Sequence, residues 1–153
     1  MIPEELPGAG DILLFDDEGE GGYPTATLPL IDGSRVLEIN PVADEVVWQY
    51  AGSKVSFFSS FLSRAQRLPN GNTLIDEGMW GRFFQVTPKG DVVWEYMSPF
   101  TGMTPGKRKV AAIRWVYRVQ AVPYSWVPSG VRQPLLPVRP PSLSEFHVGP
   151  AGR

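Results

Sequence analysis

The sequence predicts an all-β fold of short antiparallel strands. One sign is that β-branched and aromatic residues gather in short runs between turn residues. A second is the count of 16 Gly and 16 Pro among 153 residues, which favours many turns over long helices. The third and most specific sign is a sequence unit that occurs twice.

The two copies of this unit share three pieces: an opening run, a middle run that begins with arginine, and a closing Val-Val-Trp-x-Tyr run. Trp48 and Trp94, in the closing runs, are 46 residues apart. A repeat of about 40–50 residues made of short strands is typical of propellers and solenoids. The pieces lie at residues 10–16 and 71–76, at 35–41 and 82–88, and at 46–50 and 92–96.

In the first copy we expect three strands, each supported by its residue types. After a Pro/Gly-rich start over residues 1–10, strands are expected at 11–15, 35–39 and 46–50. Residues 16–33 should form a long loop, and Asn40-Pro41 should begin a turn. A fourth, opening strand of this copy would lie before Met1.

The second copy holds four expected strands joined by short turns. Asn70-Gly71 between two strand-like runs is a strong hairpin signal, because both residues tolerate positive φ. Four consecutive antiparallel strands make one propeller blade. The strands are expected within 55–68 and at 73–76, 82–87 and 92–97, with turns at 77–81 and 88–91.

A third copy begins and then stops. Residues 118–123 repeat the pattern of residues 64–69 after 54 positions, so residues 110–122 are expected to be a strand. A helix at 57–67 or 110–122 is the competing interpretation, but both segments lack caps. The sequence therefore predicts a partial β-propeller of two to three four-stranded antiparallel blades over residues 1–125, with an irregular Pro-rich tail over 126–153. The blade units are about 10–50 and 55–97, with the start of a third at 110–122.

Composition excludes several classes of function. The net charge of −2 gives no positive field for nucleic acid. Without cysteine there is no disulfide framework and no thiolate metal site. No apolar run reaches the roughly 18–20 residues that span a membrane, and the acidic start is unlike a signal peptide. The cellular location stays unknown.

Three runs of the second copy resemble the repeats of bacterial arylsulfotransferase-family β-propellers. They are residues 64–75, 81–87 and 92–96. Residues 1–16 are similar to an earlier stretch of that family, and residues 117–118 with 123–128 to a stretch near its end. Quinone-dependent-dehydrogenase-like propellers share the Gly-Asn-Thr-Leu and Val-Val-Trp-Glu-Tyr elements.

The resemblance implies a propeller of about six blades, of which this chain would be a C-terminal part. In such enzymes a histidine accepts sulfate from an aryl sulfate ester and passes it to a phenol. This chain has one histidine, His147, which lies in the tail and matches no family motif. We therefore expect an arylsulfotransferase-like propeller protein that is inactive by itself and has no catalytic residue, metal ligand or cofactor. The alternative is a non-catalytic propeller module that binds a protein or a small anion.

Arginine dominates the predicted binding site. Its guanidinium group matches the oxygens of sulfate or carboxylate, and the opening strands of blades line a central channel. Trp80, on a Gly-flanked turn, is a candidate pocket wall. The competing interpretation is that the arginines pair with acids such as Glu38, Asp76, Glu77 or Glu95. The residues predicted to bind an aryl sulfate or other small anion are Arg64, Gln66, Trp80, Arg82 and Arg118.

Two further groups of residues recur in both copies. Asp16, Asp17, Asp76 and Glu77 could bind a cation or act as an acid–base couple, but we expect solvated turns or partners for the arginines. The aromatic residues of the closing runs should pack between blades. They are Trp48, Tyr50, Trp94 and Tyr96. Exposed blade edges also predict self-association.

Overall fold

A computed structural model describes residues 1–17, 33–52, 56–102 and 114–132. These residues form seven strands and no α-helix, so the predicted all-β class is confirmed. The chain divides into two units between Ala121 and Val122, and all seven strands belong to the first. The described residues include no helix long and apolar enough to cross a membrane.

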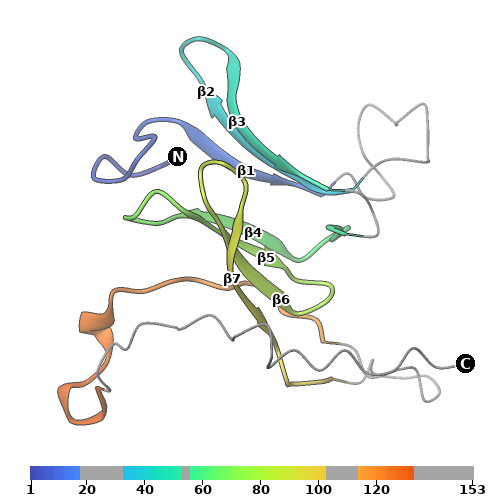
Figure 1. The fold of residues 1–153 in the computed structure, drawn as a ribbon, viewed down its shortest axis with the longest axis vertical. Coiled ribbons are helices and arrows are strands. Elements are labelled where there is room, and N and C mark those ends of the chain that lie inside the picture. The colour runs from blue at the N-terminus through green and yellow to red at the C-terminus, as the bar shows by residue number, and fades with distance from the viewer. Residues whose placement is uncertain (18–32, 53–55, 103–113, 133–153) are drawn as a thin grey trace, which may run out of the picture. The chain divides into compact units, whose positions relative to one another are not determined.

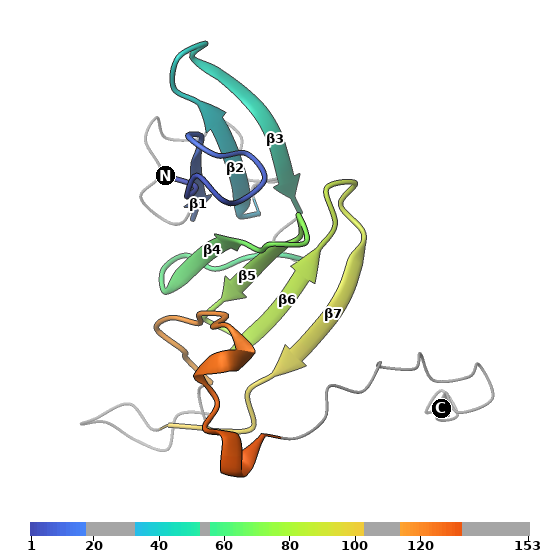
Figure 2. The same ribbon diagram turned by 90° about the vertical axis from the view of Figure 1, so that its left-hand side faces the viewer.

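The seven strands form two antiparallel sheets (Figure 1 and Figure 2). All seven lie where the sequence predicted strands, and the hairpin turn at Gly71 has the expected positive φ of 86°. The first sheet consists of β1 (Ile12–Asp16), β2 (Arg35–Asn40) and β3 (Glu45–Ala51), in that order. The second consists of β4 (Ser63–Arg67), β5 (Thr73–Glu77), β6 (Arg82–Val86) and β7 (Val92–Met97), in that order.

The core lies between the two sheets. Val36 from the first sheet and Ile75, Phe84 and Val86 from the second are fully buried, together with Phe57 from the connection before β4. Burying such side chains removes apolar surface from water and drives the packing of the sheets. Phe57 meets Phe84 edge to face, with ring centroids 5.5 Å apart.

Trp48 and Tyr50 of β3 also pack against this core, as expected, whereas Trp94 and Tyr96, which were expected to pack in the same way, are exposed. The indole Nε1–H of Trp48 donates to the carbonyl of Pro88 at 2.9 Å. Arg67 lies 5.4 Å above the Trp48 ring and forms a buried ion pair with Glu38. We call this surface, where the first sheet meets the second, the inner interface.

The two sheets share one pairing pattern. In the first, Val36 opposes Tyr50 and Glu38 opposes Trp48, and the register then shifts after Glu38. In the second, Phe83 opposes Tyr96 and Gln85 opposes Trp94, and the register shifts after Gln85. By this pattern, the inner interface uses one face of the first sheet, and the equivalent face of the second sheet points outward. We call the latter the outer face; its equivalent residues are Phe83, Gln85, Trp94 and Tyr96.

The strand expected over 110–122 is wrong for its described part, because residues 114–122 form neither strand nor helix. Instead, their backbone groups bond to the second sheet and its turn. Val116 N–H donates to the carbonyl of Gly78, and Val119 N–H donates to the carboxylate of Asp76. No described strand lies beside this segment in either sheet, so it has no ladder to join. The competing helix at 57–67 is also wrong in the structure.

The second unit contains two short 3₁₀ turns, Tyr124–Trp126 and Ser129–Val131. The Arg132 guanidinium donates to the carbonyls of Val127 and Ser125. The rest of the predicted Pro-rich tail lies outside the described residues, as do His147, residues 110–113 and most of the expected 16–33 loop.

Candidate functional site

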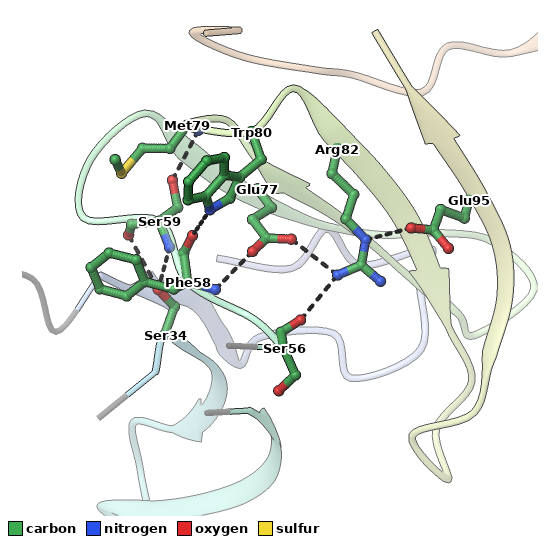
Figure 3. Close-up of polar contacts among 9 residues, drawn as sticks. All are labelled: Ser34, Ser56, Phe58, Ser59, Glu77, Met79, Trp80, Arg82 and Glu95. Carbon is green, nitrogen blue, oxygen red and sulfur yellow. Dashed lines mark hydrogen bonds and ion pairs between the residues drawn. The ribbon is translucent and has the colours of Figure 1, made fainter. Parts of the chain in front are cut away.

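The richest polar cluster lies where β5 ends and β6 begins (Figure 3). Glu77, the last residue of β5, opposes Arg82, the first residue of β6, across the sheet. Arg82 Nη1 donates to Glu77 Oε2 at 3.0 Å, and Arg82 Nε donates to Glu95 Oε1 at 2.6 Å. The guanidinium carbon also lies 4.3 Å from the centre of the Phe84 ring. Arg82 is thus held by two carboxylates and an aromatic face.

The same cluster holds the connection before β4 in place. Glu77 Oε1 accepts a hydrogen bond from Phe58 N–H at 2.7 Å, and the Trp80 indole donates to the Phe58 carbonyl at 2.9 Å. Ser59 N–H donates to Ser34 Oγ at 2.8 Å, and the Ser34 hydroxyl donates in turn to the Ser59 carbonyl at 3.1 Å. These bonds join the connection to both sheets, so this part of the predicted site is a structural junction.

Electrostatics agree with that role. Burial lowers the pKa of Arg82, but the hydrogen bonds and charges of Glu95 and Glu77 outweigh it, so the pKa is raised. The two carboxylates balance the charge of this guanidinium and occupy two of its nitrogen donors, so it attracts a further anion only weakly. Of the predicted binding residues, the structure brings Trp80 and Arg82 together here, with Trp80 55% exposed.

A second cluster lies on the other face of the second sheet. Gln66 on β4 makes two bonds to Ala121: its amide nitrogen donates to the carbonyl, and its oxygen accepts from the N–H. Arg64 donates to the side chain of Gln120 at 3.4 Å, and it opposes Asp76 across the sheet. This cluster fastens the extended segment 116–121 to the second sheet.

Asp76 is the most perturbed group of this cluster. Its side chain is fully buried, and burial raises its pKa to about 7 despite the Val119 hydrogen bond and the nearby Arg64 charge, which both lower it. Its second oxygen, Oδ1, has no hydrogen-bond partner among the described residues. A carboxyl group with this pKa can hold or release a proton near neutral pH.

The fifth predicted residue, Arg118, is exposed and lies over the ring of Tyr117 at 5.3 Å. The sequence analysis predicted that Arg64 and Arg118 bind the same small anion. In the structure the contacts of Arg64 are with Gln120, and the contact of Arg118 is with its neighbour in sequence. The predicted site is therefore divided between the junction at Arg82, the cluster at Asp76 and the exposed Arg118.

The carboxylates at the end of β1, Asp16 and Asp17, also have partners nearby. Asp16 accepts from Arg35 at 2.6 Å, which matches the pairing of Glu77 with Arg82. Asp17 accepts from Ser63 Oγ at 2.5 Å, and burial raises its pKa. Among the residues that the structure describes, no three His, Cys, Asp or Glu side chains come together to hold a metal ion.

Sequence reasoning missed several residues that build these clusters. Some of them form hydrogen bonds between loops rather than within strands; these are Ser34, Ser59 and Met79. The Sδ atom of Met79, for example, lies 3.0 Å from Ser60 Oγ. Gln120 was also missed, although its position on a segment that repeats residues 64–69 gave a signal. Comparison with protein-family models, with curated proteins and with solved structures finds no match.

Proposed function

We propose that this chain supplies sheets of an arylsulfotransferase-like β-propeller, in which it serves as a non-catalytic module that binds a further protein sheet. The observation that carries the proposal is the shared pairing pattern, with the same register shift in both sheets. Equivalent sheets that stack front to back form a series. If one face of the first sheet packs against the second sheet, the equivalent face of the second sheet should pack against a third.

The outer face supports the binding role. At the inner interface, Val36, Trp48 and Tyr50 are covered by the second sheet. Their counterparts on the outer face form a ladder of rings: Phe83 stacks on Tyr96 with centroids 5.9 Å apart, and Tyr96 stacks on Trp94 at 6.3 Å. Trp94 and Tyr96 are 39% and 44% exposed. Phe83 itself is buried, so the exposed part of the ladder is Trp94 and Tyr96. Neighbouring exposed aromatics of this kind mark an interaction surface.

The arginines support a non-catalytic role. Arg35, Arg67 and Arg82 are each paired with a carboxylate. The chemistry of sulfate transfer, as the resemblance implies it, needs a histidine nucleophile, and the one histidine of the chain matches no family motif. The small-anion alternative depends mainly on Arg64 and Arg118, which the structure places in different contacts.

The binding face can be tested with the dye 8-anilinonaphthalene-1-sulfonate, which fluoresces on exposed apolar surfaces. At a protein concentration low enough to keep the chain monomeric, we expect dye fluorescence that Trp94→Ser abolishes. Trp80→Ser is the matched control, because Trp80 is also exposed but lies at the junction. Equal loss of fluorescence in both variants would contradict an interaction surface at the outer face.

The catalytic half of the proposal has its own test. Purified protein incubated with 4-nitrophenyl sulfate and phenol should release no 4-nitrophenolate above a protein-free blank. Turnover that scales with protein concentration, and that His147→Ala removes, would show that the chain is a sulfotransferase and overturn this half of the proposal.

A further inference from the structure

The extended segment at residues 117–121 repeats β4. Each of its residues lies 54 positions after its counterpart in Ser63–Arg67. It lies on the outer side of the second sheet, because Val119 and Ala121 bond to the side chains of Asp76 and Gln66 there. In the structure Tyr117 forms a bend, and residues 118–121 run on as a trace that pairs with no described strand (Figure 1).

Among the described residues, the hydrogen bonds of this segment use one of its two edges. At the hairpin, Leu68 N–H donates to the Asn72 carbonyl, so by alternation the residues of β4 that bond to β5 are Arg64 and Gln66. Their counterparts in the segment are Arg118 and Gln120. The backbone bonds to Asp76 and Gln66 come instead from residues 119 and 121. The backbone groups of 118 and 120 therefore point to the opposite side, where a pairing strand would lie.

The first sheet has the matching vacancy. In the second sheet, β5 pairs with both β4 and β6, whereas among the described residues its counterpart β1 pairs only with β2. The chain cannot fill this edge with its own residues 117–121. They are fastened to one face of the second sheet, while the first sheet packs on the other.

We propose that residues 117–121 of one copy pair with β1 of a second copy and complete its first sheet to four strands. The inference rests on the proposed propeller-type stacking and names the partner of its outer face as another molecule of this chain. Addition of a strand to an exposed sheet edge is an established mode of recognition, in which main-chain bonds supply affinity. By analogy with the pairing of β4 and β5, Arg118 lies opposite Phe15 of the second copy, and Val119 lies opposite Leu14.

The same placement covers the outer face. The second copy's first sheet would stack on Trp94 and Tyr96 as the second sheet of each copy stacks on Trp48 and Tyr50. It would present Leu14, Leu37 and Ile39, which are counterparts of the buried Ile75, Phe84 and Val86. One placement of the second copy thus both adds a strand beside its β1 and covers Trp94 and Tyr96.

Contact between two different surfaces joins copies head to tail, so assembly continues beyond a dimer until a ring closes or an open chain forms. Light scattering should therefore show a mass above that of a dimer at high protein concentration. Arg118→Pro removes the N–H that would bond to the second copy, whereas Arg118→Ala keeps it. We expect the proline variant to need about tenfold more protein for half-association and the alanine variant to match the natural chain.

Cysteine cross-linking tests the register, because the chain contains no cysteine of its own. Mixed proteins carrying Val119→Cys and Leu14→Cys should form an intermolecular disulfide under mild oxidation, since directly opposed residues bring their Cβ atoms close. The control mixture of Val119→Cys with Leu13→Cys places the second sulfur on the opposite face of the sheet. It should cross-link on the order of tenfold more slowly.

Equal cross-linking of the two mixtures, or assembly that Arg118→Pro leaves unchanged, would overturn the strand pairing. A natural chain that stays monomeric at every concentration would overturn self-assembly altogether. That result would leave the dye experiment to decide the proposed module, because dye binding is measured on the monomer. Failure of the two proposals is therefore distinguishable.

Discussion

Asp76 joins β5 to the segment that crosses it. Its carboxyl group is fully buried, accepts the Val119 N–H at 3.1 Å and opposes Arg64 across the sheet. Burial raises its pKa from 3.8 to about 7, so the folded chain binds a proton there that the unfolded chain has already lost. Stability from this group is therefore full below pH 3.8 and falls as the pH rises to about 7.

The variant Asp76→Asn should remove this pH dependence. Its amide oxygen can still accept the Val119 N–H, and no charge has to be buried. At pH 8 we expect the variant to unfold at a higher temperature than the natural chain, by about 5 °C or on the order of 2 kcal/mol. Near pH 4 the gain should vanish. Thermal unfolding at both pH values measures the difference, and a gain that is equal at the two would contradict the raised pKa.

Arg82 should be worth more to stability than its exposed partner. Arg82→Met keeps an unbranched stem on the Phe84 ring but leaves Glu77, whose side chain is only 5% exposed, without its cation. Loss of one member of a buried pair costs about 3 kcal/mol or more. Glu95→Gln changes a side chain that is 48% exposed and should cost about 1 kcal/mol or less. Urea unfolding measures the free energy of unfolding that each variant loses. Equal losses would mean that Glu95 matters as much to the stability of the junction as the buried pair of Arg82 and Glu77.

At the scale of elements, the sequence was sufficient for all seven strands because each is bounded by its own turn residues and carries strand-forming side chains. It failed at residues 114–122, of which residues 117–121 align with β4 but pair with no described strand. A strand needs a neighbour for its hydrogen bonds, and that requirement is not local.

In the candidate site, too, some contacts follow from strand register and others do not. The pairing of Glu77 with Arg82 follows from the predicted hairpin register, and the sequence analysis considered such pairs as the alternative to anion binding. The contacts of Phe58 and Ser59 do not follow from any register. They depend on an irregular connection in which Leu62 takes a positive φ of 60°, a conformation that no local pattern indicates for leucine.

The closing strands β3 and β7 carry equivalent tryptophans in unequal surroundings. Trp48 packs in the inner interface and bonds to Pro88, whereas Trp94 lies on the outer face. In dilute protein, Trp48→Ala should therefore destabilise the chain by about 2–3 kcal/mol, and Trp94→Ala by about 1 kcal/mol or less. Denaturant unfolding followed by circular dichroism measures both. Equal losses would mean that the outer face is already covered within one copy.

At the scale of the whole molecule, the two sheets have equivalent strands and pack together through the inner interface. The outer face of the second sheet, and the face of the first sheet opposite the inner interface, therefore both point away from it. Stability of such a series is the sum of each sheet's own stability and the contacts with its neighbours. Among the residues that the structure describes, a single copy shows one such contact between sheets, the inner interface. Each head-to-tail contact between copies would add another.

The unfolding temperature should therefore rise with protein concentration. Association stabilises only the folded chain, so mass action raises the temperature at which it unfolds as more copies are present. A hundredfold increase in concentration should raise the midpoint of the natural chain by several degrees, since association gains about 2.7 kcal/mol at a hundredfold excess over the dissociation constant. Trp94→Glu places a charge in the aromatic ladder, and its midpoint should stay constant across the same range. Thermal unfolding of both proteins at several concentrations measures this, with Trp80→Glu as a control that should keep the rise. A constant midpoint for the natural chain would show that its outer face is satisfied without a second copy.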